Sequence, residues 1–134
     1  MSFLSDSSII LEEAGTSYEK EHWHRVVRKC QEACELAVKA LFRYLALEYP
    51  KSHLLGRVIK KELKNKKILT KSDLNKIAYI SDELAFNREV AFYGSPEGIP
   101  PCELFDKEDA EELFEKTKWV LKVISKIILN SEKN

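Results

Sequence analysis

The spacing of apolar residues constrains the fold of this chain more than any other feature. Between Glu21 and Glu48, apolar residues recur every three or four positions with charged residues between them: Val26, Val27, Cys30, Cys34, Ala37, Val38, Leu41 and Leu45. This repeat predicts one long amphipathic helix, because an α-helix completes a turn every ~3.6 residues. We expect the helix to end at Tyr49 and Pro50, since proline cannot continue the backbone ladder.

Four more helices are predicted from apolar repeats that follow residues able to cap a helix N-terminus. The capping residues are Ser7 or Ser8, Ser52, Thr70 or Ser72, and Asp106 with Asp109. The repeats themselves predict helices through residues 9–14, 54–63, 73–92 and 110–128, with Gly15 as a break after the first. We therefore expect an all-α, up-and-down bundle of about five helices, forming a single domain over residues 1–134.

Turn residues are scarce, which disfavours a β-sandwich or barrel. The 134 residues include only four Gly and four Pro, and residues 93–101 hold two of those Gly and three of those Pro. That segment is the one clear loop. The apolar stripes of the second and last helices are wide for so small a bundle, so we expect self-association, with a two-fold homodimer as the default.

Charge is balanced overall but unevenly distributed along the chain. The 22 Lys and Arg match the 22 Asp and Glu, which argues against a polycation that coats nucleic acid. Residues 51–76, however, carry nine Lys or Arg and two acids (net +7), whereas residues 103–116 carry seven acids and two Lys (net −5). The basic segment is a candidate phosphate-binding surface and the acidic one a candidate docking face, unless both are simply solvated helix faces.

Several site classes find no support in the sequence. No Gly-rich phosphate loop, HExxH, paired CxxC or GxSxG motif is present. Cys30 and Cys34 share an apolar helix face and fit the core, whereas His22 and His24 point to opposite sides, so we predict no metal site and no cofactor. Trp23 and Trp119 are expected to be core or interface aromatics.

The cellular compartment follows from cysteine usage and from the first residues. Three cysteines, an odd number, argue for a reducing compartment, and residues 1–10 lack the basic start of a signal peptide. No apolar run approaches the ~20 residues of a membrane-spanning helix. We expect a cytoplasmic protein without membrane contact.

Arg88 is the most informative polar residue. It lies near Leu84, Ala85 and Ala91 at the end of the fourth predicted helix, so its guanidinium should emerge beside apolar surface. A charge in such a place needs a partner. Asp82, Glu83, a carboxylate of a second subunit, or a phosphate would each serve, and the planar guanidinium suits phosphate especially well. His53, at the start of the third predicted helix, is either a capping or interface residue or a ligand contact.

Three segments together resemble HEPN domains, the all-helical domains named for higher eukaryotes and prokaryotes nucleotide-binding. Residues 35–41, Glu-Leu-Ala-Val-Lys-Ala-Leu, look like the signature of the family's second helix. Residues 50–55, which include His53, resemble the opening of its third helix, and residues 87–94 with the Pro-rich loop and 109–112 resemble its fourth helix, loop and final helix. The resemblance covers about residues 5–130.

The resemblance implies a dimer with a site near the seam between subunits, at the end of the fourth helix. Catalytic members look like metal-independent ribonucleases that use an arginine followed closely by a histidine. Arg88 fits the arginine, with Asn87 beside it, but Tyr93 stands in the histidine position and no histidine follows Arg88. Tyrosine, with a usual pKa near ~10, is a poor general base. Arg88 and Tyr93 therefore remain candidates for catalysis without an assignment.

Three functions stay open from the sequence. The first is a homodimer that binds nucleotide or RNA phosphate through Arg88, Asn87, Tyr93 and His53, with added attraction from Lys60 and Lys61. The second is a metal-independent, toxin-like endoribonuclease. The third is an interaction module whose acidic stretch from Glu103 to Glu115 docks a protein partner. The resemblance suggests a toxin–antitoxin or nucleotidyltransferase-linked system, with a nucleotidyltransferase-type partner.

Overall fold

The computed structural model describes residues 2–51 and 55–132. Over these residues the chain is an all-α bundle of five α-helices and one short 3₁₀ helix, without a strand. The helices are α1 (Ser2–Glu19), α2 (Trp23–Tyr44), α3 (Leu55–Leu63), α4 (Lys71–Tyr93) and α5 (Lys107–Glu132), and the 3₁₀ helix η1 (Pro101–Glu103) precedes α5. The predicted fold class is confirmed.

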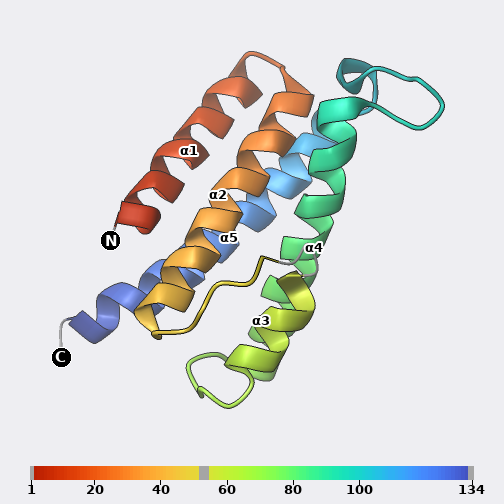
Figure 1. Cartoon of the computed structure of the whole chain (residues 1–134). Coiled ribbons are helices and arrows are strands. Elements are labelled where there is room, and N and C mark those ends of the chain that lie inside the picture. The colour runs from red at the N-terminus through yellow and green to blue at the C-terminus, as the bar shows by residue number, and fades with distance from the viewer. Residues whose placement is uncertain (1, 52–54, 133–134) are drawn as a thin grey trace.

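Helix α2 lies at the centre of the bundle. It contacts α1, α4 and α5, and α3 packs against α4 on the outer side (Figure 1). Eleven residues of α2 are buried: Val26, Val27, Cys30, Gln31, Ala33, Cys34, Ala37, Val38, Ala40, Leu41 and Phe42. The wide apolar stripe that suggested self-association is therefore covered within the chain itself.

The first two helices differ from their predicted bounds. Helix α1 begins at Ser2, so Ser7 is not its cap; the Ser7 hydroxyl is buried and donates to the carbonyl oxygen of Ala33 at 2.7 Å. Gly15 does not break the helix, because α1 packs against α2 and α5 along its length. Glu21 and Ala46 have φ values of 61° and 57°, which a helix cannot accommodate, so α2 starts after the first and ends before the second.

Helices α4 and α5 begin where the capping residues predict. The Thr70 hydroxyl accepts the Asp73 backbone N–H at 3.0 Å. Before α5, the Asp106 carboxylate accepts the Asp109 N–H at 2.9 Å, and the Asp109 carboxylate accepts the Asp106 N–H at 3.1 Å. This reciprocal pair satisfies two N–H groups that a bare helix start leaves without acceptors. Ser52, the predicted cap of α3, lies outside the described residues.

Helix α3 fixes the lower half of α4. The Gly56 N–H donates to the Asp82 carboxylate at 2.9 Å, and a Cβ atom at Gly56 would lie 2.7 Å from the Ala78 carbonyl oxygen. Only glycine allows this close approach. The upper half of α4 extends beyond α3 toward the loop of residues 94–106 (Figure 1). No helix in the described part of the chain has the length and apolar character required to span a membrane.

Candidate functional site

The C-terminal end of α4 and the N-terminal end of α2 meet at the top of the bundle. Phe92 of α4 is the centre of this region. The Arg28 guanidinium carbon, from α2, lies 3.7 Å from the centroid of the Phe92 ring, and the Arg88 guanidinium carbon lies 5.1 Å from it. Arg28, Arg88, Phe92 and Tyr93 are called the Arg–Phe cluster below. Such distances are those of cation–π contacts, which stabilise by about 0.5–1 kcal/mol where exposed.

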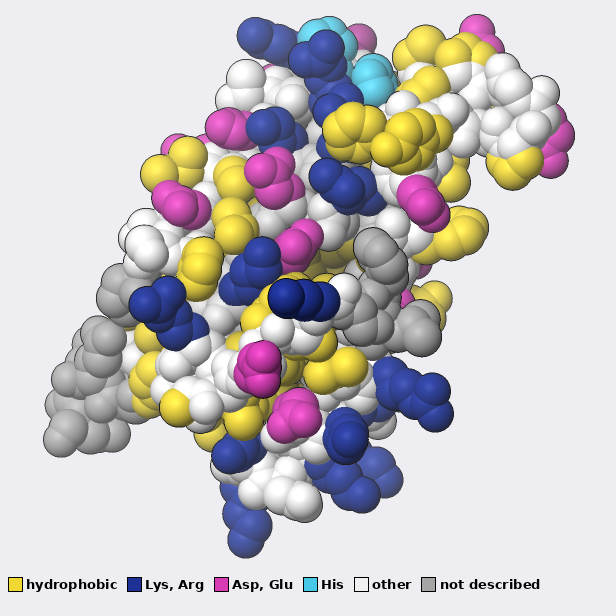
Figure 2. Space-filling view, viewed as in Figure 1, with side chains coloured by type: hydrophobic (Ala, Val, Ile, Leu, Met, Phe, Trp, Pro, Cys, Tyr) yellow, Lys and Arg dark blue, Asp and Glu magenta, His cyan; other side chains and the backbone are white. Residues whose placement is uncertain are grey.

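Within the described residues, neither arginine of the cluster forms an ion pair with a carboxylate. None of the ion pairs among the described residues includes Arg28, Arg88 or the neighbouring Arg25, and the first turn of α2 contains no acidic residue. The positive end of the α2 dipole adds to the positive potential of these arginines. Figure 2 shows Lys and Arg side chains gathered with the two histidines at this end of the molecule. The region is therefore suited to an anion.

The cluster also presents aromatic surface to solvent. Phe92 is 42% exposed and Tyr93 is 82% exposed, and their ring centroids lie 5.8 Å apart at an interplanar angle of 40°. An exposed ring of this kind can stack on a nucleic-acid base. Unpaired guanidinium groups and exposed rings thus lie side by side.

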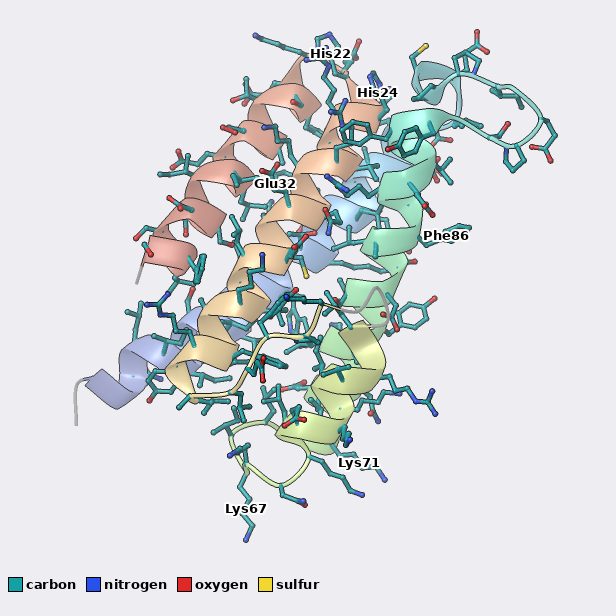
Figure 3. All side chains as sticks on the ribbon, in the orientation of Figure 1. His22, His24, Glu32, Lys67, Lys71 and Phe86 are labelled. Atoms are coloured by element: carbon teal, nitrogen blue, oxygen red, sulfur yellow. The ribbon has the colours of Figure 1, made fainter. Side chains whose placement is uncertain are left out.

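His24 lies next to the cluster, a placement the sequence did not reveal. It precedes Arg28 by four residues on α2, a spacing that puts two side chains on one helix face. Figure 3 shows it at the upper end of α2, near the top of α4. Partial burial and the charges of Arg25, Arg28 and His22 lower the pKa of His24 below its usual 6.5. At neutral pH its imidazole is therefore mostly neutral and can accept a proton.

The Arg88 guanidinium emerges beside an apolar ring as expected, but neither of the two carboxylates expected as partners within the described residues pairs with it. Arg88 is exposed, so no burial penalty demands a carboxylate. Asp82 accepts the Gly56 N–H instead, and Glu83 binds the Lys116 ammonium at 2.8 Å. Arg88 sits so near the end of α4 that its apolar neighbours no longer enclose it.

Asn87 faces a different part of the surface from Arg88. Its side-chain N–H donates to the Glu83 carbonyl oxygen at 2.8 Å, and it lines a cavity of about 310 Å³ between α4, η1 and α5. The other lining residues are Glu83, Phe86, Val90, Leu104, Phe105, Asp109, Glu112 and Leu113. Three carboxylates make this cavity acidic, so it does not suit phosphate.

Lys116 lies beside this cavity and shares its charge between two carboxylates, Glu83 at 2.8 Å and Glu112 at 2.9 Å. Burial lowers the pKa of Lys116, but the two carboxylates outweigh that effect and raise it overall. The acidic residues nearest to Lys116 are thus already paired within the chain.

The remaining predicted ligand residues lie elsewhere or are not described. Lys60 and Lys61 are exposed on α3, which packs along the lower half of α4, away from the Arg–Phe cluster. Figure 3 shows Lys67 and Lys71 at the same lower end. His53 lies outside the described residues. Within one chain, Arg88 and Tyr93 therefore lie near each other, on either side of Phe92, and both lie far from the lysines of residues 51–76.

The described cysteines and histidines are dispersed and do not form a metal centre. Cys30 and Cys34 are buried in the core as predicted, and burial raises the pKa of each thiol to about 12. In the described part of the chain, no group of three or more His, Cys, Asp or Glu is arranged to hold a metal ion.

Comparison with known families decides the identity. A model of the HEPN domain matches residues 2–128 of the 134. The chain belongs to the HEPN domain family. HEPN domains are generally nucleotide-binding or ribonuclease-like, and they often dimerise. Comparisons of this HEPN chain with curated proteins and with solved structures returned no match.

The sequence pointed to Arg88 and Tyr93 of this HEPN domain but missed Arg28, Phe92 and His24. Phe92 follows Arg88 by four residues, so helical spacing alone could have paired them. Arg28 reaches Phe92 only because α2 and α4 pack together, and no local pattern signals such a contact.

Proposed function

We propose that this HEPN domain binds a nucleotide or RNA through its phosphate at the Arg–Phe cluster, as a cytoplasmic homodimer. The supporting observation is the pair of guanidinium groups, Arg28 and Arg88, that share one exposed ring and form no ion pair with a carboxylate among the described residues. Arg88 anchors the phosphate, Arg28 adds a second cation, and Tyr93 hydrogen-bonds or stacks on a base. Guanidinium groups donate two parallel hydrogen bonds to phosphate, which makes them strong anchors.

The experiment is a titration of labelled single-stranded RNA and of ATP, by fluorescence anisotropy, at low and moderate salt with EDTA present. Arg88→Ala should weaken binding by about tenfold or more, because one hydrogen-bonded ionic contact contributes about 1.5–3 kcal/mol. It should also lower the slope of log affinity against log salt by about one.

Arg43→Ala is the matched control for this titration. Arg43 lies on α2 with its guanidinium carbon 5.7 Å from the Phe3 ring, so it forms the same kind of cation–aromatic pair at the other end of the helix. We expect this variant to bind like the unmodified protein. Equal binding by Arg88→Ala and Arg43→Ala would overturn the proposal.

A second candidate function is metal-independent RNA cleavage, and the placement of His24 favours it. A neutral His24 can accept the proton of an RNA 2′-hydroxyl. The 2′-oxygen then forms a bond to phosphorus, and the bond to the 5′-oxygen breaks, leaving a 2′,3′-cyclic phosphate; the 5′-oxygen takes a proton from water. Arg88 and Arg28 stabilise the charge that develops on the phosphoryl oxygens.

Cleavage is tested on a denaturing gel with EDTA present. Fragments that disappear in both His24→Gln and Arg88→Ala, but persist in Arg43→Ala, would support catalysis, because a contaminating nuclease would ignore these substitutions. Intact RNA together with salt-sensitive binding would support the binding function and contradict cleavage.

The acidic surface from Glu103 to Glu115 supports a third proposal: docking of a protein partner, such as a nucleotidyltransferase of a toxin–antitoxin system. Exposed acids there include Glu108, Asp109 and Glu111. A stoichiometric complex recovered in pull-downs, together with failure to bind nucleic acid, would favour docking over phosphate binding. Charge reversal at Glu108 and Glu111 should then abolish the complex.

A further inference from the structure

The cavity between α4, η1 and α5 has an apolar lining on both of its long sides. Its volume of about 310 Å³ lies at the small end of the range for ligand pockets, roughly 300–1,000 Å³. Two aromatic and three aliphatic side chains contribute to the lining: Phe86, Phe105, Val90, Leu104 and Leu113. The space therefore suits one long side chain or a small molecule with an apolar body.

The carboxylates of this cavity retain capacity for further donors. Glu83 and Glu112 each bind the Lys116 ammonium through one oxygen, at 2.8 Å and 2.9 Å. Asp109 accepts the Asp106 backbone N–H through one oxygen at 3.1 Å. A carboxylate offers about four lone-pair sites, so none of the three is saturated by these contacts.

Asn87 adds a neutral acceptor to the same cavity. Its side-chain nitrogen donates to the Glu83 carbonyl oxygen at 2.8 Å, which fixes the orientation of the amide and leaves its oxygen as an acceptor. The three carboxylates of the lining, against the single ammonium of Lys116, leave two negative charges. A ligand of this cavity must therefore be cationic and must supply several N–H donors.

A guanidinium group meets these requirements better than an ammonium group. It is planar, carries five N–H donors and is more weakly hydrated, so it stacks on aromatic rings while its edge donates to carboxylates. Phe86 and Phe105 supply the rings. The same kind of contact already exists within the chain, where the Arg28 guanidinium carbon lies 3.7 Å from the centroid of the Phe92 ring.

The surroundings of the cavity favour a protein as the source of this guanidinium. Exposed carboxylates continue beyond the cavity, on η1 and along the first turns of α5, at Glu103, Glu108 and Glu111. Their field attracts further positive charge on either side of the group inside the cavity. A basic segment of a protein uses both the cavity and this field, whereas a free small cation uses the cavity alone.

We propose that the cavity receives an arginine side chain from a basic segment of a protein partner. The guanidinium lies against the aromatic walls and donates to Glu112, Asp109 and the Asn87 side-chain oxygen. The neighbouring basic residues of the partner lie over the exposed acids of α5. This inference rests on the docking role proposed for the acidic surface and supplies the anchor that such a partner uses.

The first experiment titrates fluorescein-labelled hexa-arginine and hexa-lysine peptides against the protein by fluorescence anisotropy at low salt. Both peptides carry the same charge, so the difference between them measures the guanidinium contribution. Hexa-arginine should bind more tightly by about threefold or more, the size of one cation–aromatic contact. Equal affinities, or no binding of hexa-arginine, would overturn the arginine site.

Glu112→Gln and Glu111→Gln then locate the site on α5. The two residues are neighbours and the substitutions remove the same charge, but only Glu112 lines the cavity. Glu112→Gln should weaken hexa-arginine binding by about tenfold, because it removes a hydrogen bond between charged groups. Glu111→Gln should weaken it by less than about threefold, as for an exposed ion pair. Equal losses would mean that α5 holds the peptide by its general charge, and the cavity would fail.

Phe86→Ala and Tyr79→Ala test the aromatic wall. Both rings project from α4 and are 70% and 64% exposed, but only Phe86 lines the cavity. Phe86→Ala should lower the preference for hexa-arginine over hexa-lysine, and Tyr79→Ala should leave it unchanged. A preference that survives intact in Phe86→Ala would overturn the proposed stacking site.

Competition with agmatine distinguishes a protein partner from a small molecule. Agmatine carries the same guanidinium on a short chain but no further basic residues, so it should displace labelled hexa-arginine only at concentrations far above those of the unlabelled peptide. Displacement by agmatine and by the unlabelled peptide at equal concentrations would identify a small-cation site and overturn the peptide anchor.

The same peptide separates this inference from the docking role on which it rests. If Glu108→Lys/Glu111→Lys weakens hexa-arginine binding and Glu112→Gln does not, the docking role stands and the arginine anchor fails. If neither substitution weakens binding, the docking role itself fails. Weakening by both supports the anchor within an acidic docking surface.

Discussion

The two halves of α4 have the same local structure but different surroundings. Its lower half is enclosed: Ile77, Ala78 and Ile80 are buried, and α3 approaches so closely that Gly56 tolerates no side chain. Its upper half ends in Phe92 and Tyr93, both exposed, with Arg28 and Arg88 against one ring. Packing against α3 encloses the lower half, whereas the side chains of Phe92 and Tyr93 at the end of the upper half are open to a ligand.

This difference predicts which substitutions reduce stability and which reduce ligand binding. A change in the enclosed part should reduce stability and affect binding only through unfolding, whereas a change at the open end should affect binding and leave stability nearly intact. Each prediction below tests one side of that division, in order of decreasing expected effect.

Leu84 and Phe86 offer the sharpest contrast, because they lie two residues apart on opposite sides of α4. Leu84 is fully buried and Phe86 is 70% exposed. Leu84→Ala should lower the free energy of unfolding by about 2–5 kcal/mol, through lost burial and the cavity left behind. Phe86→Ala should change the stability of the subunit by less than about 0.5 kcal/mol. Urea denaturation of each single variant beside the unmodified protein measures both changes; similar losses at the two positions would contradict the division.

Gly56 tests the contact between α3 and α4. In Gly56→Ala the new methyl group meets the Ala78 carbonyl oxygen and the Asp82 carboxylate, so the helices must separate and stability should fall by about 1–3 kcal/mol. Gly15→Ala is the matched control, because a Cβ there lies 3.5 Å from Phe114, an ordinary contact. That variant should gain about 0.5–1 kcal/mol from helix propensity. Thermal melts with opposite shifts would confirm the prediction, and shifts of the same sign would contradict it.

Thr70 tests the start of the same helix. Its hydroxyl accepts the Asp73 N–H at 3.0 Å, so Thr70→Ala should cost about 1 kcal/mol of stability. Thr70→Ser keeps the acceptor and should restore most of that loss. RNA affinity should not change in either variant, because Thr70 lies at the end of α4 opposite the cluster. Loss of binding in a folded Thr70→Ala protein would contradict the separation of the two halves.

Local chemistry explains why parts of this fold were predictable from the sequence. Thr70, Asp106 and Asp109 act through hydrogen bonds within three residues, so their pattern is visible in a short window. Ser7 carried the same signal but serves another purpose, since its hydroxyl binds Ala33 of a neighbouring helix. A helix cap can therefore be predicted from the sequence only when no acceptor on a distant element competes for the capping side chain.

The candidate site was less predictable because it depends on helix packing. Arg88 was identified from its apolar neighbours along the helix and Tyr93 from a family pattern, but Arg28 joins them only across the α2–α4 contact. The grouping of Lys60 and Lys61 with Arg88 assumed that residues of like chemistry converge, whereas the α3–α4 hairpin holds them apart. The chemistry of the candidate residues is therefore visible in the sequence, whereas their positions relative to one another depend on helix packing.

The smallest expected effect concerns the ionisation of His24 at the open end. Its pKa is lowered by partial burial and by the charges of Arg25, Arg28 and His22. In the unfolded chain His24 has its usual pKa of 6.5, so it binds a proton at a higher pH than in the folded protein. Stability should therefore decline slightly as the pH falls from 6.5 through the folded pKa. His24→Gln should remove this decline.

The His24 imidazole can be followed directly by NMR titration. Its midpoint should lie below 6.5 and should rise in Arg28→Gln, which removes one of the neighbouring charges. A phosphate bound at the Arg–Phe cluster should raise the same midpoint, because its negative charge favours the imidazolium. By linkage, binding should then tighten as the pH falls through that range. A midpoint that RNA leaves unchanged, under conditions where RNA binds, would place the ligand away from His24 and the upper end of α4.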